Sequence, residues 1–149
     1  MAPYSIEELR EAYEHFSRVS DECAASADYN AFADLFTEDC RYIEHVFGEM
    51  HGRDEVRQWI VPLMKQYPND QMTYTHDWVI FDNENGRVIF SARTHMPDLG
   101  DGREYSTTNW SMIDYAGGGQ WSREEDIYNP AHFATLLTEW QAAKDTAGK

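Results

Sequence analysis

The first part of the chain has the apolar spacing of helices. Ser5 is followed by two acidic residues, as at a typical helix start, and apolar side chains then recur every three or four residues, at Ile6, Leu9, Tyr13, Phe16 and Val19. The same reasoning predicts a short helix over residues 28–36 and a third helix over 54–67, which Pro62 should kink or end early. Between these two helices, residues 40–47 have the composition of a strand.

From Gln71 onward the period of the pattern changes to two. Four strands are predicted, over residues 72–81, 87–96, 103–115 and 120–128. The short loops between them are rich in Gly, Asn and Asp, which favours antiparallel hairpins. Pro130 then opens a C-terminal helix. Helices followed by a run of strands indicate an α+β fold, and the whole chain, 1–149, fits one domain.

Alternation along the strands groups many polar side chains on shared faces. The sets are Tyr74, His76 and Trp78; Ser91, Arg93 and His95; Thr107, Asn109 and Ser111; and Glu124, Asp126 and Tyr128. Two interpretations are open: these faces are solvated and the opposite faces form the core, or these faces line a cavity. Periodicity alone favours the solvated face.

Composition narrows the classes of partner. The formal net charge of −15 repels phosphate backbones, which argues against nucleic-acid binding. No run of residues is long and apolar enough for a membrane span, and the N-terminal residues do not have the pattern of a signal peptide. Cys23 and Cys40 form neither a disulfide framework nor a metal-binding spacing, so we expect a cytoplasmic protein with no metal.

Three segments resemble a known family. They are FADLFTEDC at 32–40, MHGRDEV at 50–56 and EEDIYNP at 124–130, and together with the pattern around them they are similar to SnoaL-like domains of the nuclear transport factor 2-like superfamily. Relatives include polyketide cyclases, scytalone dehydratase, ketosteroid isomerase and limonene epoxide hydrolase. The resemblance implies a cone-shaped fold, with a curved antiparallel sheet wrapped around N-terminal helices and a C-terminal helix. It also implies a deep small-molecule pocket, no cofactor, and a homodimer formed through the outer sheet face.

The resemblance implies that the polar faces of the strands line the cavity, and it indicates candidate catalytic residues. Arg93 and Asp126 match charged residues of limonene epoxide hydrolase, and His95 stands where that family has an acid. A histidine paired with a carboxylate can act as a general base. We therefore expect His95 to move a proton with the help of Asp126, while Arg93 holds a substrate oxygen. The alternative is a structural hydrogen bond or a surface salt bridge.

His76 is a second candidate base. It resembles a catalytic histidine of scytalone dehydratase that an aspartate at the end of the first helix holds. The matching position here is Ala25, so Asp21 or Glu22, about one turn earlier, is the expected substitute. The alternative is that His76 is a packing residue with its hydrogen bonds satisfied.

The remaining candidates are expected to bind the substrate. Thr107 and Asn109 resemble a Ser-x-Asn pair of scytalone dehydratase, and the Asn109 amide could stabilise developing negative charge. Four aromatic residues complete the set: Tyr42, Tyr74, Trp78 and Tyr128. The resulting hypothesis is cofactor-independent acid–base catalysis on an aromatic or polycyclic compound, by a lyase or dehydratase or by an isomerase or cyclase. The alternatives are a non-catalytic ligand-binding or dimeric interaction module, and an epoxide hydrolase-like enzyme.

Overall fold

The helices lie where the apolar spacing is strongest. A computed structural model of the chain describes residues 2–148, and its α-helices are α1 (Ile6–Ser26), α2 (Asn30–Ala33), α3 (Arg53–Met64) and α4 (Pro130–Thr146). The start of α1 is as expected, because the Ser5 hydroxyl accepts a hydrogen bond from the backbone N–H of Glu8 at 3.1 Å. Pro62 lies inside α3, which ends soon after it. No helix among residues 2–148 has the length and apolar character needed to cross a membrane.

Six strands form one sheet. They are β1 (Phe36–Glu44), β2 (Gly48–His51), β3 (Thr73–Asp82), β4 (Arg87–His95), β5 (Ser106–Gly117) and β6 (Gln120–Ile127). The order across the sheet is β2-β1-β6-β5-β4-β3. The four late strands are confirmed to within a few residues. β2 was not expected, because its four residues begin at a glycine that resembles turn punctuation.

The sheet is mixed, which corrects the expectation of a purely antiparallel one. β1 runs parallel to β6, whereas every other neighbouring pair is antiparallel. Hairpin loops can join only antiparallel neighbours, but β1 and β6 are far apart in the chain, so no short loop constrains their direction. The backbone N–H of Trp121 donates to the carbonyl of Leu35 at 2.8 Å where this parallel pairing begins.

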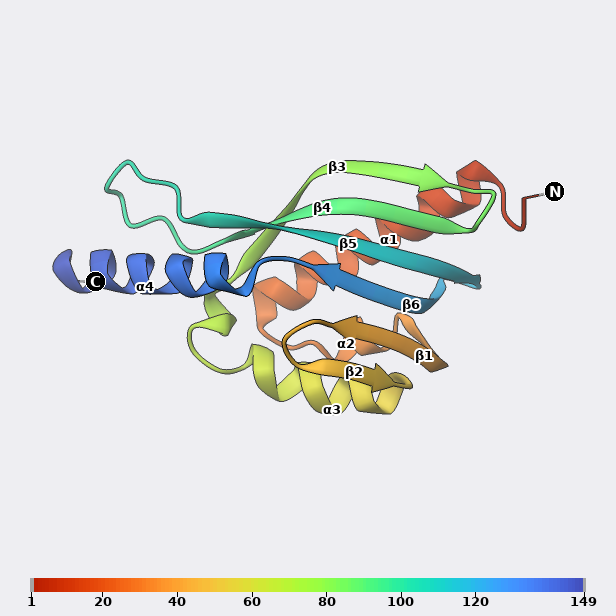
Figure 1. Cartoon of the computed structure of the whole chain (residues 1–149), viewed down its shortest axis with the longest axis horizontal. Coiled ribbons are helices and arrows are strands. Elements are labelled where there is room, and N and C mark those ends of the chain that lie inside the picture. Colours follow the sequence, from red (N-terminus) through yellow and green to blue (C-terminus); the bar gives the residue numbers. More distant parts are fainter. Residues whose placement is uncertain (1, 149) are drawn as a thin grey trace.

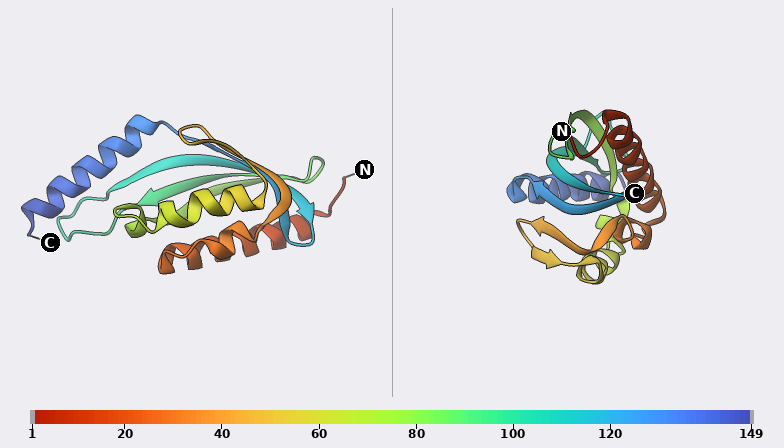
Figure 2. Two further views of the ribbon diagram at one scale, coloured as in Figure 1. Left: turned by 90° about the horizontal axis from the view of Figure 1, so that it is seen from below. Right: turned by 90° about the vertical axis from the view of Figure 1, so that its right-hand side faces the viewer.

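The main core lies between the sheet and the helices α1 and α3, which cover one face (Figure 2). Its fully buried members include Leu9, Phe36, Val56 and Trp121. A separate, smaller cluster lies beside α4, at the end of the sheet, and consists of Met72, Met96, Leu99, Tyr105, Leu136 and Trp140. The fold therefore has one large core and a second, smaller one near α4.

Candidate active site

A cavity of about 240 Å³ opens between the inner face of the sheet and the helices. Its walls are mostly apolar and include Phe16, Phe32, Trp59, Ile60, Leu63, Phe90 and Phe133. None of the described residues that line it is a lysine or an arginine. The polar groups that reach it come mainly from the first half of β3, the C-terminal ends of β1 and β6, and β5, with Ser20, Asn69 and Thr94 contributing from elsewhere.

Six of the ten predicted site residues line this cavity: Tyr42, Tyr74, His76, Asn109, Asp126 and Tyr128. Their position follows from the strand pairing, in which His76 lies opposite Ala92 and Ala92 lies opposite Asn109. In the next row, Ser111 lies opposite Asp126. On β3, β5 and β6 the cavity interpretation is therefore the right one for these side chains, although their roles remain predictions.

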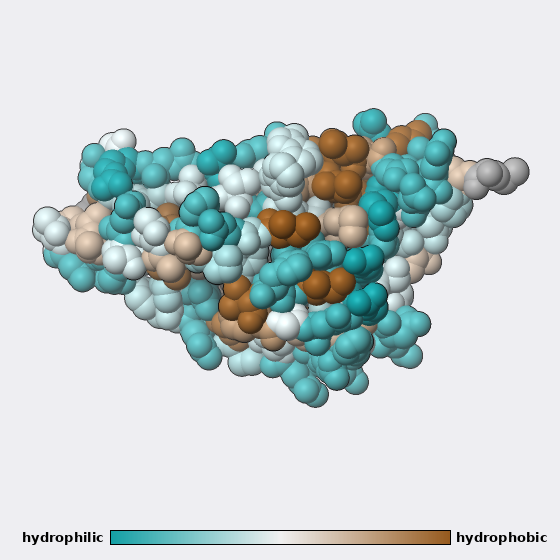
Figure 3. Space-filling view, in the orientation of Figure 1, coloured by the Kyte–Doolittle hydropathy of each residue, from teal (hydrophilic) through white to brown (hydrophobic). Residues whose placement is uncertain are grey.

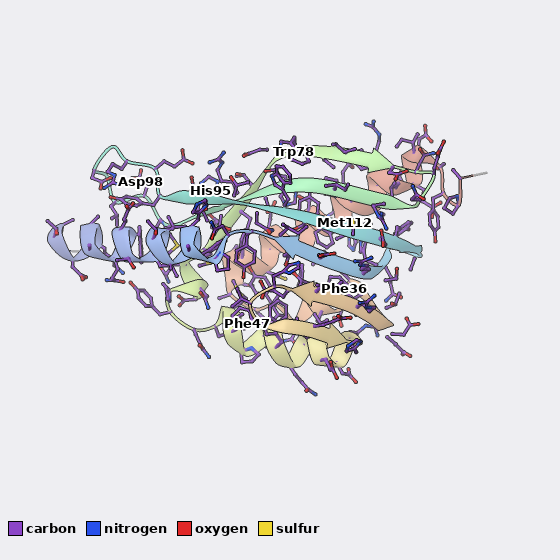
Figure 4. All side chains as sticks on the ribbon, viewed as in Figure 1. Phe36, Phe47, Trp78, His95, Asp98 and Met112 are labelled. Atoms are coloured by element: carbon purple, nitrogen blue, oxygen red, sulfur yellow. The ribbon has the colours of Figure 1, made fainter. Side chains whose placement is uncertain are left out.

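Arg93 and His95 lie on the other face of β4, so the expected His95–Asp126 pair is not formed. Phe90, Ala92 and Thr94 face the cavity instead. Arg93 forms an ion pair with Asp77 at 2.9 Å. His95, which is labelled in Figure 4, lies 2.7 Å from the Thr75 hydroxyl and 3.3 Å from Glu104. The alternative interpretation, surface contacts, is the correct one for both residues.

Trp78 also points outward, because a β-bulge interrupts β3. His76 pairs with Ala92 and Trp78 pairs with Ser91, so the residue between them, Asp77, has no partner of its own. The bulge breaks the alternation, and His76 and Trp78 end on opposite faces. The Trp78 ring contacts Trp110 on the outer face, with ring centroids 5.6 Å apart.

Thr107 does not reach the cavity. It lies opposite Thr94 near the start of β5 and lines a separate hollow beside α4, together with His132 and Glu139. The predicted pair of Thr107 and Asn109 is therefore divided between two places, and only Asn109 contacts the cavity.

The polar end of the cavity is built around two carboxyl groups of β6, Glu124 and Asp126. Tyr42 on β1 places its hydroxyl oxygen 2.5 Å from Asp126 Oδ2 and 3.1 Å from Glu124 Oε1. On the other side, the Ser111 hydroxyl donates to Asp126 Oδ1 at 2.7 Å, and the Asn109 amide donates to Ser111 at 2.8 Å. Asp126 is thus held by a hydrogen bond to each of its oxygens.

Burial sets the protonation of the pair. It raises the pKa of Glu124 well above the usual range, and the nearby charge of Asp126 raises it further. Burial also raises the pKa of Asp126, but hydrogen bonds from Glu124, Tyr42 and Ser111 oppose the shift. Glu124 is therefore the member that keeps a proton, and Asp126 is the member that ionises first.

Glu44 adds a third carboxyl group, which sequence reasoning missed. It lies opposite Asp126 in the pairing of β1 with β6, and only 4% of its surface is exposed. Its Oε2 accepts hydrogen bonds from the backbone N–H groups of Val46 at 2.8 Å and Phe47 at 2.6 Å. Burial raises the pKa of Tyr128, and a hydrogen bond to Glu44 adds to that shift.

His76 lies on the wall formed by β3. Its Nδ1 hydrogen-bonds to the hydroxyl of Tyr13 on α1, and its ring stacks on Phe90 with centroids 4.4 Å apart. Burial lowers the pKa of His76, opposed by the charges of Asp21 and Asp77, so the ring is neutral near pH 7. The partner of His76 is thus a tyrosine. Asp21, Glu22 and Ala25 are all exposed, and Asp21 acts on the ring only through its field.

Within residues 2–148, no group of three or more His, Cys, Asp or Glu side chains is arranged to hold a metal ion. The site offers instead a carboxylate with a raised pKa, a neutral carboxyl group, the carboxyl group of Glu44, several tyrosine hydroxyls, an amide and a neutral imidazole. These groups can accept, hold and donate protons around a small apolar molecule.

Comparison with known proteins agrees with this architecture. A family model described as "SnoaL-like domain" matches residues 6–124. No curated protein sequence matches the chain.

Solved structures with the same fold share little sequence with it. A polyketide cyclase-like protein from Xanthomonas campestris is 19% identical, with a TM-score of 0.62 over 87% of this chain and 98% of that one. An LEH-like epoxide hydrolase from M. tuberculosis is 11% identical, with a TM-score of 0.68 over 94% and 96%. TerC, crystallised with polyporic acid, is 16% identical, with a TM-score of 0.62 over 88% and 98%. At sequence identities this low, the similarity establishes a shared fold and nothing about a shared activity.

Proposed function

Because this chain belongs to the SnoaL-like domain family, we propose that its cavity is the active site of a small-molecule enzyme that works by acid–base catalysis. The family and the solved structures support, at a coarser level, a small-molecule enzyme or binding protein. The observation that carries the proposal is the buried pair of Glu124 and Asp126, held by Tyr42 and Ser111 at one end of an apolar cavity. A carboxylate with a raised pKa in such surroundings is a suitable general base.

In the proposed reaction Asp126 removes a proton from carbon. The neutral Glu124 donates a hydrogen bond to the oxygen that gains negative charge, and the Asn109 amide lies close by for the same purpose, while Tyr42 keeps its hydrogen bond to Asp126. His76, neutral and held by Tyr13, is the second proton carrier. Proton removal followed by loss of a leaving group is a lyase or dehydratase reaction, and return of the proton to another atom is an isomerase reaction. In a cyclase reaction the carbanion instead attacks a carbonyl carbon of the same molecule, and the carbonyl oxygen takes up the proton as its π bond breaks. The first is the outcome that we favour.

A general proton-abstraction assay tests the proposal without knowledge of the natural substrate. A base that removes the ring C–H proton of 5-nitrobenzisoxazole breaks its N–O bond and releases a coloured cyanophenolate. We expect the protein to accelerate this elimination, and the acceleration to depend on Asp126. Binding of the probe with no acceleration would favour a non-catalytic binding protein of the same fold.

The pH dependence of this reaction is expected to follow the ionisation of Asp126. The base must be ionised, so kcat/KM rises with pH through a midpoint above the ordinary aspartate pKa of about 3.9 and then levels. In Tyr42→Phe the carboxylate loses a hydrogen bond that lowers its pKa, so the midpoint should move to higher pH.

Tyr105→Phe is the matched control for this experiment. Tyr105 also donates to a carboxylate, that of Asp101 at 2.6 Å, but lies in the smaller core, so its loss should leave the midpoint in place. A midpoint that stays fixed or falls in Tyr42→Phe would contradict the assignment of Asp126 as the base.

We also propose that the outer sheet face forms a homodimer. This face exposes a row of apolar side chains, with Trp78 39%, Trp110 55% and Ile127 55% exposed, and Ile80, also 55% exposed, lies one row away. Figure 3 views this face and shows its hydrophobic patches. Exposed apolar patches of this kind mark interaction surfaces.

Trp110→Asp should convert the dimer to a monomer in analytical ultracentrifugation, because it places a charge in the middle of the buried row. Val46→Asp is the control, since Val46 is 51% exposed in the turn after β1 and lies off the sheet face. Equal masses for Trp110→Asp and the unmodified protein would refute the proposed interface.

A further inference from the structure

The acidic end of the cavity has no cationic partner. Glu44, Glu124 and Asp126 all line the cavity, and neither lysine nor arginine is among the described lining residues. Glu44 and Asp126 are direct neighbours across the parallel strand pair, and Glu124 is opposite Tyr42 in the same pair. Buried carboxylates are normally paired or coordinate a cation. A cation is therefore the group that this end of the cavity lacks.

Hydrogen-bond acceptors at this end are also unpartnered. Glu124 is 4% exposed, and its Oε2 accepts no hydrogen bond from the described chain, so the ionised form of Glu124 would have an unsatisfied acceptor. The Oδ1 atom of Asn109, buried on the same side of the cavity, accepts none either. A buried acceptor without a donor costs free energy unless a ligand supplies one. A ligand that brings hydrogen-bond donors would therefore satisfy Asn109 and the ionised form of Glu124.

Aromatic rings surround these acceptors. The Trp59 ring lies 5.1 Å from that of Tyr42 and 5.8 Å from that of Phe47, and the rings of Tyr128 and Phe133 are 4.8 Å apart. The faces of aromatic rings attract cations, more strongly when the site is desolvated. The aromatic walls and the acidic residues thus both favour a positively charged group on the ligand.

From these contacts we propose that the ligand of this cavity is an amine, with its ammonium group among Glu44, Glu124 and Asp126 and a small apolar body against the aromatic walls. The inference rests on the proposed function in taking this cavity as the substrate site, and it replaces the donor role given there to the neutral Glu124, which an ammonium group would ionise. A cavity of about 240 Å³ is smaller than the roughly 300–1,000 Å³ of drug-sized pockets, so the body is a single ring rather than a polycyclic system.

An ammonium group should also displace the proton of Glu124. This carboxyl group faces Asp126 on its own strand and Tyr42 on β1, while Glu44 lies beside Asp126 and Tyr128 beside Glu44. All of these neighbours are acidic or neutral, so a bound cation changes the balance in favour of the ionised form. Binding of an amine should therefore release a proton and strengthen as the pH rises.

Isothermal titration calorimetry with three probes tests the inference. The probes, 2-phenylethylamine, 2-phenylethanol and phenylacetate, have similar shapes but carry a positive charge, no charge and a negative charge. Because hydrogen bonds to charged groups are the stronger ones, we expect the amine to bind about tenfold or more tighter than the alcohol, and phenylacetate to bind weakest. Titrations in buffers with different heats of protonation should show proton release with the amine and none with the alcohol.

Glu124→Gln keeps the shape of the side chain and removes its charge. It should weaken amine binding about tenfold, abolish the proton release, and leave alcohol binding within about twofold. Glu125→Gln is the matched control, because Glu125 follows it on β6 and faces outward, where it pairs with His45 at 2.9 Å and Arg123 at 2.9 Å. Both probes should bind this control as they bind the unmodified protein.

Three results would overturn the amine assignment: no binding of the amine, equal or tighter binding of phenylacetate, or amine affinity that survives Glu124→Gln. None of them involves turnover. Selective amine binding without elimination of 5-nitrobenzisoxazole would contradict the proposed catalysis alone. Elimination with a preference for phenylacetate would contradict the amine alone.

Discussion

Replacing Asp126 with asparagine is expected to lower kcat/KM for 5-nitrobenzisoxazole by about 10²–10⁴-fold, the usual contribution of a positioned general base. Asparagine has almost the same shape, and its single oxygen can still accept one of the two hydrogen bonds that Tyr42 and Ser111 donate to Asp126. It cannot take up a proton at neutral pH. The loss should therefore appear mainly in kcat, with probe binding little changed.

Glu125→Gln serves as the control for this substitution, since it removes one carboxylate from the adjacent position of β6 on the outer face. Its rate should equal that of the unmodified protein. His95→Ala should also retain the rate, because His95 contacts Thr75 and Glu104 outside the cavity. If Asp126→Asn retains full activity while His95→Ala loses it, the base has been assigned to the wrong face of the sheet.

The largest loss of stability is expected for Trp121→Ala. Trp121 is fully buried near the start of β6, with ring centroids 5.0 Å from Tyr115 and 5.8 Å from Phe16. Removing such a ring should lower the free energy of unfolding by about 3–5 kcal/mol, because the cavity that remains cannot collapse completely. Chemical denaturation, followed by circular dichroism, measures the loss.

Trp121→Phe should lose less than about half as much. It keeps most of the apolar contact and removes the indole N–H, for which the described part of the chain provides no acceptor. Equal losses for the two variants would mean that the indole N–H makes an important hydrogen bond. No loss in Trp121→Ala would contradict the position of this residue in the core.

The order of helices and strands could be predicted because long amphipathic segments carry a strong periodic signal. Whether an individual side chain points into the cavity or outward could not be predicted. Alternation tells which residues of one strand share a face, but Arg93 and His95 show that it does not tell which face turns toward the helices. On β3 the unpaired Asp77 also changes the phase within one strand, and nothing in the local sequence indicates such a bulge.

The sequence contained a partial indication that Glu124 and Glu44 belong to the site. Glu124 shares a face with Asp126, and Glu44 shares a face with Tyr42, so alternation placed both beside predicted site residues. Glutamates at alternating positions usually belong to a solvated face, and only the parallel pairing of β1 with β6 brings these two groups together in the interior. Pairing between distant strands depends on the whole fold, which a local pattern does not contain.

The proton held by Glu124 makes the stability of the folded protein depend on pH. In the unfolded chain this side chain ionises near its ordinary pKa of about 4.3, whereas in the folded chain burial keeps it protonated to higher pH. Between those two values folding takes up a proton, so the contribution of Glu124 to stability is full below the lower value and declines as the pH rises toward the upper one. With the cavity empty, the folded state therefore loses stability as the pH rises above the ordinary glutamate pKa, and a bound cation would oppose this loss.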